Sequence, residues 1–328
     1  MDLSTTYLGL RLPHPLMPGA SPLVDDLDQV RRLEDAGAAA IVMHSLFEEQ
    51  IAREERSIHA HVDRHEATFA EALSFLPDGF PLGPDEYLEQ LRKIKAMVSV
   101  PVIGSLNGTT LGGWLRYAKL IQDAGADALE LNVYHVATDL SEPGSTFEAR
   151  TIDMVRELKR SVRIPVAVKL SPFWSSIAHF GAQLDAAGAD GIVVFNRFYQ
   201  PDIDVEELEV RPTLHLSDPH ELLLRLHAVA VLSRRIRPSL AVTGGVHSGL
   251  DAVKAVMCGA HAVQTVSSLL KRGAGHLATL IADLRRWLEE HEYESLAQAQ
   301  GSMGLERCPD PKSYERGNYM KVLQSWGR

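Results

Sequence analysis

The stretch DAGADALELN, residues 123–132, joins a helix-like segment to a short apolar run through a glycine. Similar stretches are DAGAAAIVM at 35–43, AAGADGIVVFN at 186–196 and MCGAHAVQT at 257–265. Glycine after a helix readily takes the left-handed conformation that other residues avoid, and a short run of apolar and β-branched residues favours a strand. Each of these stretches therefore predicts a joint between a helix and a strand.

Further apolar runs lie at suitable distances from these joints: PLMPGA at 15–20, VPVIGS at 100–105, IPVAVKLS at 164–171 and LAVTGG at 240–245. Most of the runs are separated by amphipathic stretches, such as 85–98, 151–162 and 220–236, in which apolar residues recur every three or four positions. Eight apolar strands that alternate with helices predict a (β/α)8 TIM barrel, a parallel sheet closed on itself and covered by helices.

Three intervals are longer than a joint requires, namely roughly 46–84, 133–148 and 197–219, and each follows a predicted strand. In such barrels the loops after the strands form the C-terminal mouth, where the active site lies. We therefore expect insertions over the mouth of one domain, residues 1–328. Its last segment, roughly 302–328, is expected to be a polar tail packed on the barrel.

The composition and charge of the chain indicate which kinds of molecule it can bind. The chain has 328 residues, 45% of them hydrophobic, and a formal net charge of −10, which disfavours binding to nucleic acid or to an anionic membrane. No run approaches the roughly 18 apolar residues of a membrane span, and the start, MDLSTTYLGL, does not read as a targeting segment. With only two cysteines, a disulfide framework is not expected. We predict a cytoplasmic protein without nucleic-acid or membrane partners.

The predicted strands end in polar or small residues, which should meet at one rim of the barrel. These residues are Ala20 and Ser21; His44 and Ser45; Ser105 and Asn107; Asn132; Lys169 and Ser171; Asn196; Gly244 and Gly245; and Thr265 and Ser267. Taken singly, a polar end can be a simple strand terminator. Lys169 is harder to explain in this way, because a buried ammonium needs an anionic or hydrogen-bonding partner. We expect that partner to be a ligand.

Two of these rim segments also predict a site for phosphate. TGGVHSG, residues 243–249, precedes a helix expected over 248–258, and QTVSSLL, residues 264–270, opens another helix. Backbone N–H groups at the start of a helix bind anions, and barrels of this type commonly hold phosphate after their seventh and eighth strands. The sequence therefore predicts a phosphate cradle at these two places.

In their order and spacing these stretches resemble the dihydroorotate dehydrogenase family, flavin mononucleotide (FMN) enzymes built on a (β/α)8 barrel. The resemblance runs from LSTTYLGLRLPHPLMPGAS through ELN, VKLSP, FN and TGGVHSGLDAVKAVMCGAHAVQ to WLEEHEYESLAQAQGSM. It implies an FMN cofactor and the oxidation of dihydroorotate, in pyrimidine biosynthesis, or of a related CH–CH substrate. It also implies a soluble electron acceptor or a redox partner protein, and a homodimer.

The resemblance assigns roles to individual residues. Lys169 matches the family lysine whose ammonium lies beside the flavin, where negative charge grows on reduction. Asn132 and Asn196 match amides that hold flavin and substrate. The other positions implied to bind the cofactor are Ala20, Ser21, His44, Ser45, Ser105, Asn107, Gly244, Gly245, Val266 and Ser267.

The substrate side departs from the family pattern. The family loop Asn-x-Ser-Cys-Pro-Asn, whose Cys or Ser is the base, reads NVYHVA at 132–137 here. His135 takes the position of the base, and an imidazole needs less help to accept a proton near neutral pH than a thiol or a hydroxyl does. Ala137 replaces an amide that contacts substrate, His44 replaces a lysine, and SFLPDGFPLG at 74–83 stands where another family segment is not recognisable.

Three alternatives remain open. An FMN oxidoreductase acting on another substrate would keep the cofactor side of the site. An aldolase-like barrel would use Lys169 to form a Schiff base. A non-catalytic subunit would only hold flavin for a redox complex. The stretch HAHVDRH, residues 59–65, has residue types that bind metals, but we expect a solvated lid there and predict no metal site.

Overall fold

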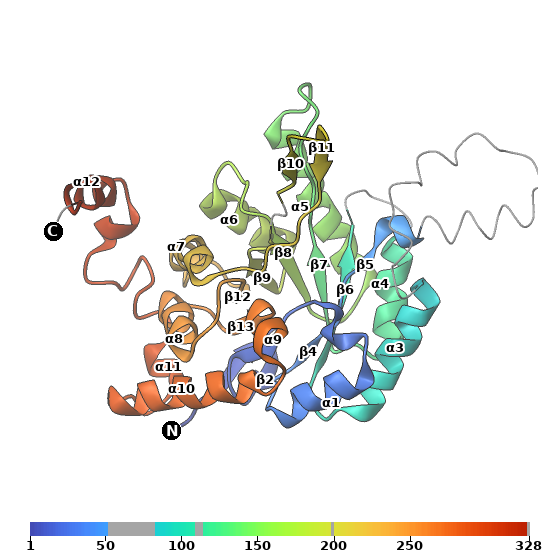
Figure 1. Ribbon diagram of the computed structural model, residues 1–328, viewed down its shortest axis with the longest axis horizontal. Coiled ribbons are helices and arrows are strands. Elements are labelled where there is room, and N and C mark those ends of the chain that lie inside the picture. The colour runs from blue at the N-terminus through green and yellow to red at the C-terminus, as the bar shows by residue number, and fades with distance from the viewer. Residues whose placement is uncertain (52–82, 109–113, 198–199, 327–328) are drawn as a thin grey trace, which may run out of the picture.

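The computed structural model describes residues 1–51, 83–108, 114–197 and 200–326. Within these residues the centre of the molecule is a barrel of eight parallel strands (Figure 1). In hydrogen-bonded order the strands are β3 (Leu16–Pro18), β13 (Ala262–Thr265), β12 (Ser239–Thr243), β9 (Gly191–Val194), β8 (Val166–Leu170), β7 (Ala128–Asn132), β6 (Val102–Asn107) and β4 (Ile41–Val42). The N–H of Ala39 donates to the carbonyl of Leu16 at 3.1 Å and links β4 to β3. The predicted (β/α)8 barrel is confirmed.

Helices surround the barrel, as Figure 1 shows. They are α1 (Leu27–Asp35), α3 (Pro84–Met97), α4 (Trp114–Asp123), α5 (Gly144–Ser161), α6 (Ile177–Ala187), α7 (Leu222–Leu232), α8 (Gly249–Cys258), α9 (Ser267–Arg272), α10 (His276–Glu290) and α11 (Leu296–Ala299), with the 3-10 turns η1 (Pro22–Val24), η3 (Pro219–Glu221) and η4 (Pro311–Tyr314). The joint glycines Gly37, Gly125, Gly188 and Gly259 all have positive φ, between 90° and 122°. These glycines therefore make the joints that the repeated stretch predicts.

The floor of the barrel is closed by an antiparallel hairpin, β1 (Thr5–Tyr7) and β2 (Leu10–Leu12). Tyr7, Leu8 and Leu12 pack in one buried cluster with small residues of the barrel interior: Ala128, Ala167, Ala241 and Ala262. The hydroxyl of Thr5 donates to the carbonyl of His261 at 3.0 Å, and the N–H of Leu8 donates to the hydroxyl of Ser239 at 3.2 Å. Large hairpin side chains thus fill the space that the alanines leave.

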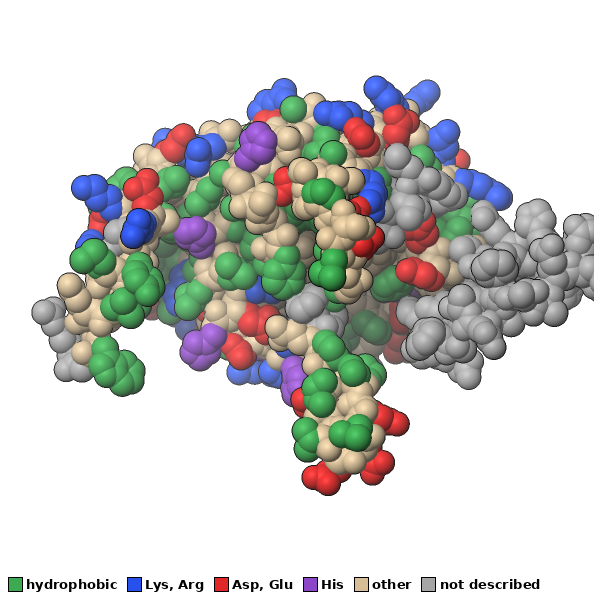
Figure 2. All heavy atoms as spheres, turned by 90° about the horizontal axis from the view of Figure 1, so that it is seen from above, with side chains coloured by type: hydrophobic (Ala, Val, Ile, Leu, Met, Phe, Trp, Pro, Cys, Tyr) green, Lys and Arg blue, Asp and Glu red, His purple; other side chains and the backbone are tan. Residues whose placement is uncertain are grey.

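The insertions after the strands differ in what they form. Strand β5 (Leu46–Phe47) pairs with the end of β6, and residues 52–82 of the first insertion, with HAHVDRH and nearly all of SFLPDGFPLG, lie outside the described residues. Helix α5 begins at Gly144, so the loop after β7 ends earlier than predicted. The third insertion forms an exposed hairpin, β10 (Asp202–Asp204) and β11 (Glu209–Arg211), which projects with hydrophobic and acidic side chains together (Figures 1 and 2).

The tail, residues 302–326, contacts the barrel in its first part. The N–H of Met303 donates to the carbonyl of Met257 at 2.7 Å, and the N–H of Leu305 donates to that of Ala230 at 2.9 Å. Helix α12 (Gly317–Gln324) lies well away from the barrel helices in Figure 1 and exposes large apolar side chains. None of the helices in the described part of the chain has the length and apolar content needed to cross a membrane.

Buried histidines make the stability of this fold depend on pH. The N–H of Leu240 donates to Nδ1 of His261 at 3.0 Å, and Nδ1 of His14 accepts from the N–H of Leu16 at 3.2 Å. Burial lowers the pKa of both imidazoles. Because their folded pKa lies below the unfolded value of about 6.5, the unfolded chain takes up protons first as the pH falls. The stabilisation is therefore present above about pH 6.5 and is lost as the pH falls through the folded pKa.

We predict that the free energy of unfolding is lower at pH 5 than at pH 7.5, by up to about 1.4 kcal/mol per pH unit for each histidine. Urea unfolding across this range measures the slope. In His261→Gln, which keeps a hydrogen-bond acceptor but does not titrate, the slope should be smaller. A slope equal to that of the parent in both His261→Gln and His14→Gln would show that other groups cause the dependence.

Candidate active site

The barrel interior on the mouth side holds a buried ion pair. Lys169 of β8 is 5% exposed and Glu130 of β7 is 1% exposed, and Nζ of Lys169 donates to Oε1 of Glu130 at 3.1 Å. Nε2 of Gln264, on β13, donates to the other carboxylate oxygen at 2.7 Å. Lys169 therefore already has an anionic partner within the protein, Glu130, and a ligand as its partner stays a prediction. Every second residue of a strand points into the barrel, and this alternation places the side chains of Glu130 and Lys169 on the inside, next to each other.

Asn132 and Asn196 form an amide pair beside this lysine. Nδ2 of Asn196 donates to Oδ1 of Asn132 at 3.0 Å, and Asn132 is the register partner of Lys169 on the neighbouring strand. Asn107, on β6, is the register partner of Asn132 on its other side and is buried. The structure therefore brings together Asn107, Asn132, Lys169 and Asn196, four of the residues predicted from the strand ends.

The ends of β4 and β6 bring a second group of predicted residues together. The hydroxyls of Ser45 and Ser105 are 2.8 Å apart, and the N–H of Ser105 donates to the hydroxyl of Tyr87 at 2.9 Å. Nδ1 of His44 lies 2.5 Å from Oδ1 of Asp25, and the His44 ring meets the Tyr87 ring edge-on. The Asp25 carboxylate thus faces the His44 imidazole at short range, without a hydrogen bond between these two atoms.

The end of β3 leaves a polar atom without a protein partner. Ser21 is buried, and within the described residues its hydroxyl has no hydrogen-bond partner. Ala20 packs beside it against the interior cluster. At Gly19 an added Cβ would lie 3.0 Å from the Val266 side chain and 3.2 Å from Gln264, so the backbone approaches β13 closely there. A buried hydroxyl without a partner is unfavourable, and a polar ligand atom would satisfy it.

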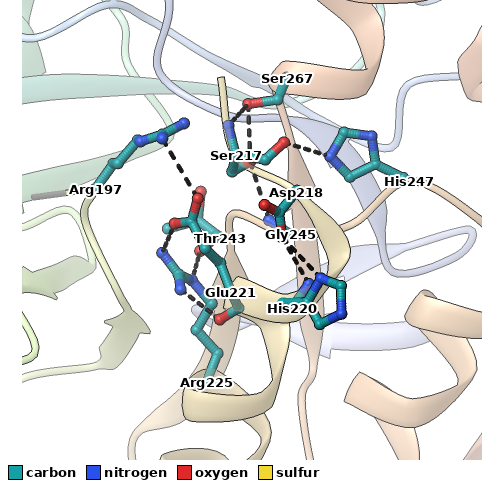
Figure 3. Close-up of polar contacts among 10 residues, drawn as sticks. All are labelled: Arg197, Ser217, Asp218, His220, Glu221, Arg225, Thr243, Gly245, His247 and Ser267. Carbon is teal, nitrogen blue, oxygen red and sulfur yellow. Dashed lines mark hydrogen bonds and ion pairs between the residues drawn. The ribbon is translucent and has the colours of Figure 1, made fainter. Parts of the chain in front are cut away.

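Several residues of the predicted phosphate cradle contact one residue, Ser217 (Figure 3). The hydroxyl of Ser217 accepts from the N–H of Gly245 at 3.1 Å and lies 2.8 Å from that of Ser267. Nε2 of His247 lies 2.7 Å from the Ser217 carbonyl. Gly244 and Gly245 have φ of +89° and +79°, and a Cβ on Gly245 would lie 2.5 Å from the backbone nitrogen of Leu222. Only glycine fits there without distortion.

The N-terminus of α8 is satisfied by its own side chains. The Asp251 carboxylate accepts from the N–H groups of His247 and Ser248, and the Ser248 hydroxyl accepts from the N–H of Asp251. This capping box occupies donors that TGGVHSG was expected to offer to an anion. The groups that remain for a phosphate are the Ser217 and Ser267 hydroxyls and the start of α9, where Val266 is the N-cap and Ser267 the first residue, because the Gly245 N–H already donates to Ser217.

An arginine fixes the glycine loop from the outside of the barrel (Figure 3). Arg225 of α7 is buried, and its Nε donates to the carbonyl of Thr243 at 2.5 Å while Nη1 donates to that of Glu221 at 2.6 Å. Glu221 also forms an ion pair with Arg197, which follows Asn196. These contacts join the end of β12 to the start of α7 and so hold Gly244 in place.

His135 contacts residues in and just before helix α5, outside the barrel. Its ring stacks on Phe147 of α5 with 4.9 Å between ring centroids, and Nε2 lies 3.9 Å from Oε2 of Glu142, which also pairs with Arg150. The side chain is 27% exposed. Within the described residues, none of its hydrogen bonds, ion pairs or ring contacts is with Lys169 or with the Asn132–Asn196 pair. Its role as the base stays a prediction.

Reading the strand ends alone missed several residues of this site. Glu130 and Gln264 are polar side chains inside apolar strands, the same signal that identified Lys169, but they lie two positions before Asn132 and one position before Thr265, the strand ends that were considered. Asp25 and Ser217 lie in irregular segments and have no comparable signal. Their roles depend on contacts that only the folded chain makes.

A closed (β/α)8 barrel with a buried lysine, amides and glycine loops at its C-terminal mouth defines a class of enzymes that act on small molecules at this end. The family model for dihydroorotate dehydrogenase matches residues 66–288, more than half of the chain. The chain belongs to the dihydroorotate dehydrogenase family, a family of oxidoreductases that act on CH–CH groups.

Relatives named dihydroorotate dehydrogenase B (NAD(+)), catalytic subunit, are similar along most of the chain. The protein of Thermoplasma acidophilum is 27% identical over 307 residues, which is 92% of this chain and 98% of the relative. That of Desulforudis audaxviator is 30% identical over 217 residues, 63% of this chain and 69% of the relative. A protein of Aeropyrum pernix, provisionally named dihydroorotate dehydrogenase A (fumarate), is 26% identical over 307 residues, 92% of this chain and 97% of the relative.

Proposed function

We propose that this chain is an FMN-dependent dehydrogenase that oxidises dihydroorotate or a closely related CH–CH substrate at the barrel mouth. The observation that carries the proposal is the set of buried Lys169 and Asn132 with the partly buried Asn196, on the same rim as the Gly245–Ser267 cradle. A cation, planar amides and an anion-binding loop are the groups that a phosphorylated flavin needs. The unpartnered hydroxyl of Ser21 agrees with a ligand at this rim.

Each part of the site has a place in this proposal. The hydroxyls of Ser217, which the Gly245 N–H positions, and of Ser267 would hold the phosphate together with the start of α9. Ala20, Ser21, His44, Ser45, Ser105 and Asn107, the buried or half-buried residues at the ends of β3, β4 and β6, would lie along the ring system. The unpaired hydroxyl of Ser21 supports a ligand at this place.

When bound, FMN supplies a two-electron acceptor for hydride. Oxidation of a CH–CH bond releases one hydride and one proton, and the proton needs a base on the protein. We assign this task to His135, which takes up the proton from the substrate carbon. Asn132 and Asn196 orient the substrate, and Lys169 stabilises the negative charge that accumulates beside it.

We further propose that the electrons leave to a soluble acceptor or to an electron-carrying partner protein, that the chain forms a homodimer, and that it works in the cytoplasm. The resemblance along most of the chain supports these points. The relatives are named for different acceptors, NAD(+) and fumarate, so the acceptor has to be measured.

The decisive experiment uses the purified full chain and its visible spectrum before and after addition of FMN. We expect a yellow protein whose colour bleaches on anaerobic mixing with dihydroorotate, and turnover with fumarate, a quinone or NAD as acceptor. A yellow protein that dihydroorotate does not bleach would indicate another substrate. A colourless chain that takes up no FMN would contradict the proposal, and borohydride trapping of a carbonyl substrate on Lys169 would then favour the aldolase-like alternative.

The contacts of Lys169 argue against that alternative. Lysines that form Schiff bases are activated by an apolar pocket or by a neighbouring cation. Lys169 instead has the carboxylate of Glu130 as its neighbour, at 3.1 Å.

A further inference from the structure

Glu130 is placed beneath Lys169, inside the barrel, and has no part in the roles assigned so far. Its carboxylate accepts one hydrogen bond from Lys169 at 3.1 Å and one from Gln264 at 2.7 Å. A buried carboxylate is strongly unfavourable unless it is paired and hydrogen-bonded, so these two donors fix its position. Glu130 and Lys169 are also the only charged side chains in the described barrel strands.

The two side chains are at different depths. Glu130 comes two residues before Asn132 on the same face of β7, and Asn132 is the register partner of Lys169. Glu130 therefore starts one layer nearer the floor and holds the ammonium from below. An ammonium has three N–H donors. Within the described residues Glu130 is the only side chain that accepts from Nζ, which leaves the other donors for groups at the mouth.

The neighbouring titratable groups add no opposing charge. Tyr7 and Tyr87 are buried near Glu130, and the pKa of each phenol is raised, first by burial and also by the charge of Glu130. Both phenols are therefore neutral at physiological pH. The positive charge of Lys169 is thus partly neutralised by the single carboxylate of Glu130. The two charges interact through the protein interior, which screens them less than water does.

We propose that Glu130 is a positioning residue that tethers the Lys169 ammonium and sets how strongly its charge favours the reduced flavin. The inference rests on the proposed function, because it requires FMN at the mouth. Reduction adds negative charge to the isoalloxazine ring, so the positive charge of Lys169 favours reduction and the negative charge of Glu130 opposes it. Removing the negative charge should make the flavin easier to reduce.

The test is the two-electron midpoint potential of the FMN-loaded full chain with Glu130→Gln. Glutamine keeps the size and an acceptor for Lys169 but removes the charge. We expect the reduction equilibrium to shift about tenfold toward the reduced flavin, as a nearby charge does for an ionising group, which is about 30 mV for a two-electron couple. The dissociation constant for sulfite, an anion that adds to oxidised flavins, should fall by a similar factor. Glu34→Gln removes the same charge near Ser99, outside the barrel interior, and should change neither value.

Lys169→Met and the double variant show whether Glu130 acts through the lysine. If it does, Glu130→Gln shifts the potential more in the parent than in the Lys169→Met background, where only the direct field of the carboxylate on the flavin remains; equal shifts in both backgrounds would show that Glu130 does not act through Lys169. Should Glu130→Gln fail to fold, Gln264→Leu keeps the carboxylate and removes its second donor, and we then expect a smaller shift toward the oxidised flavin. Unchanged potentials in an FMN-loaded variant that folds would overturn the inference and leave the proposed function standing. A parent chain that takes up no FMN would overturn both.

Discussion

Replacing Lys169 with methionine is expected to slow reduction of the bound flavin by substrate by about 10²–10³-fold, the usual loss when one preorganised electrostatic group is removed. It should also lower the free energy of unfolding by about 3–5 kcal/mol, because the buried Glu130 carboxylate would keep only its hydrogen bond from Gln264. Anaerobic stopped-flow absorbance measures the first effect, and urea unfolding measures the second.

The matched control is Lys95→Met. Nζ of Lys95 lies 2.6 Å from the Asp127 carboxylate, but both side chains are partly exposed, and the pair lies at the start of β7. Loss of this pair should cost about 0.2–1 kcal/mol of stability and leave flavin reduction unchanged. If Lys169→Met reduced its flavin at the parent rate, Lys169 would have no electrostatic role in the reaction.

Replacing His135 with alanine is expected to slow flavin reduction by about 10²–10⁴-fold, because the proton released with the hydride would lose its acceptor. The contacts of His135 with Phe147 and Glu142 fix the ring at the start of α5, so the variant tests whether this loop histidine reaches substrate at all. The measurement is the rate constant for bleaching by dihydroorotate under anaerobic conditions, with FMN content determined for each variant.

Two other histidines serve as comparisons. His291 stacks on Trp287 at the end of α10, with 3.8 Å between ring centroids, so His291→Ala removes a similarly stacked ring outside the proposed site and should leave the rate unchanged. His44 lies on the rim and faces the carboxylate of Asp25. If His135→Ala kept the parent rate and His44→Ala lost it, the base would be His44.

The barrel could be predicted from the sequence because each joint depends on local chemistry. Gly37, Gly125, Gly188 and Gly259 lie in the left-handed region, where a side chain would be strained, and each is followed by a strand residue within a few positions. The apolar runs after them can be buried only as strands of a sheet covered on both faces. The joints between helices and strands can therefore be predicted from the repeated stretch alone, without knowledge of contacts that are distant in the sequence.

The contacts that complete the site could not be predicted in the same way. Ser217 meets Ser267, 50 positions later, and Gln264 meets Glu130, 134 positions away. Asp25 faces His44 from an irregular segment that no periodicity describes. The partner of Lys169 was missed for a simpler reason: Glu130 is a charged residue in an apolar strand, but on that strand only Asn132, two positions later, was considered.

The hairpin at the barrel floor also bears on the order in which the chain can fold. Thr5 bonds to a carbonyl 256 positions later, and Leu8 to a hydroxyl 231 positions later. At a synthesis rate of about 5–20 residues per second, a ribosome needs roughly 10–50 s to produce those partners. Until then the apolar residues Tyr7, Leu8 and Leu12 have no permanent place to bury themselves. In the nascent polypeptide the hairpin therefore stays without its final packing partners until β12 and β13 have been synthesised, and the barrel floor closes late.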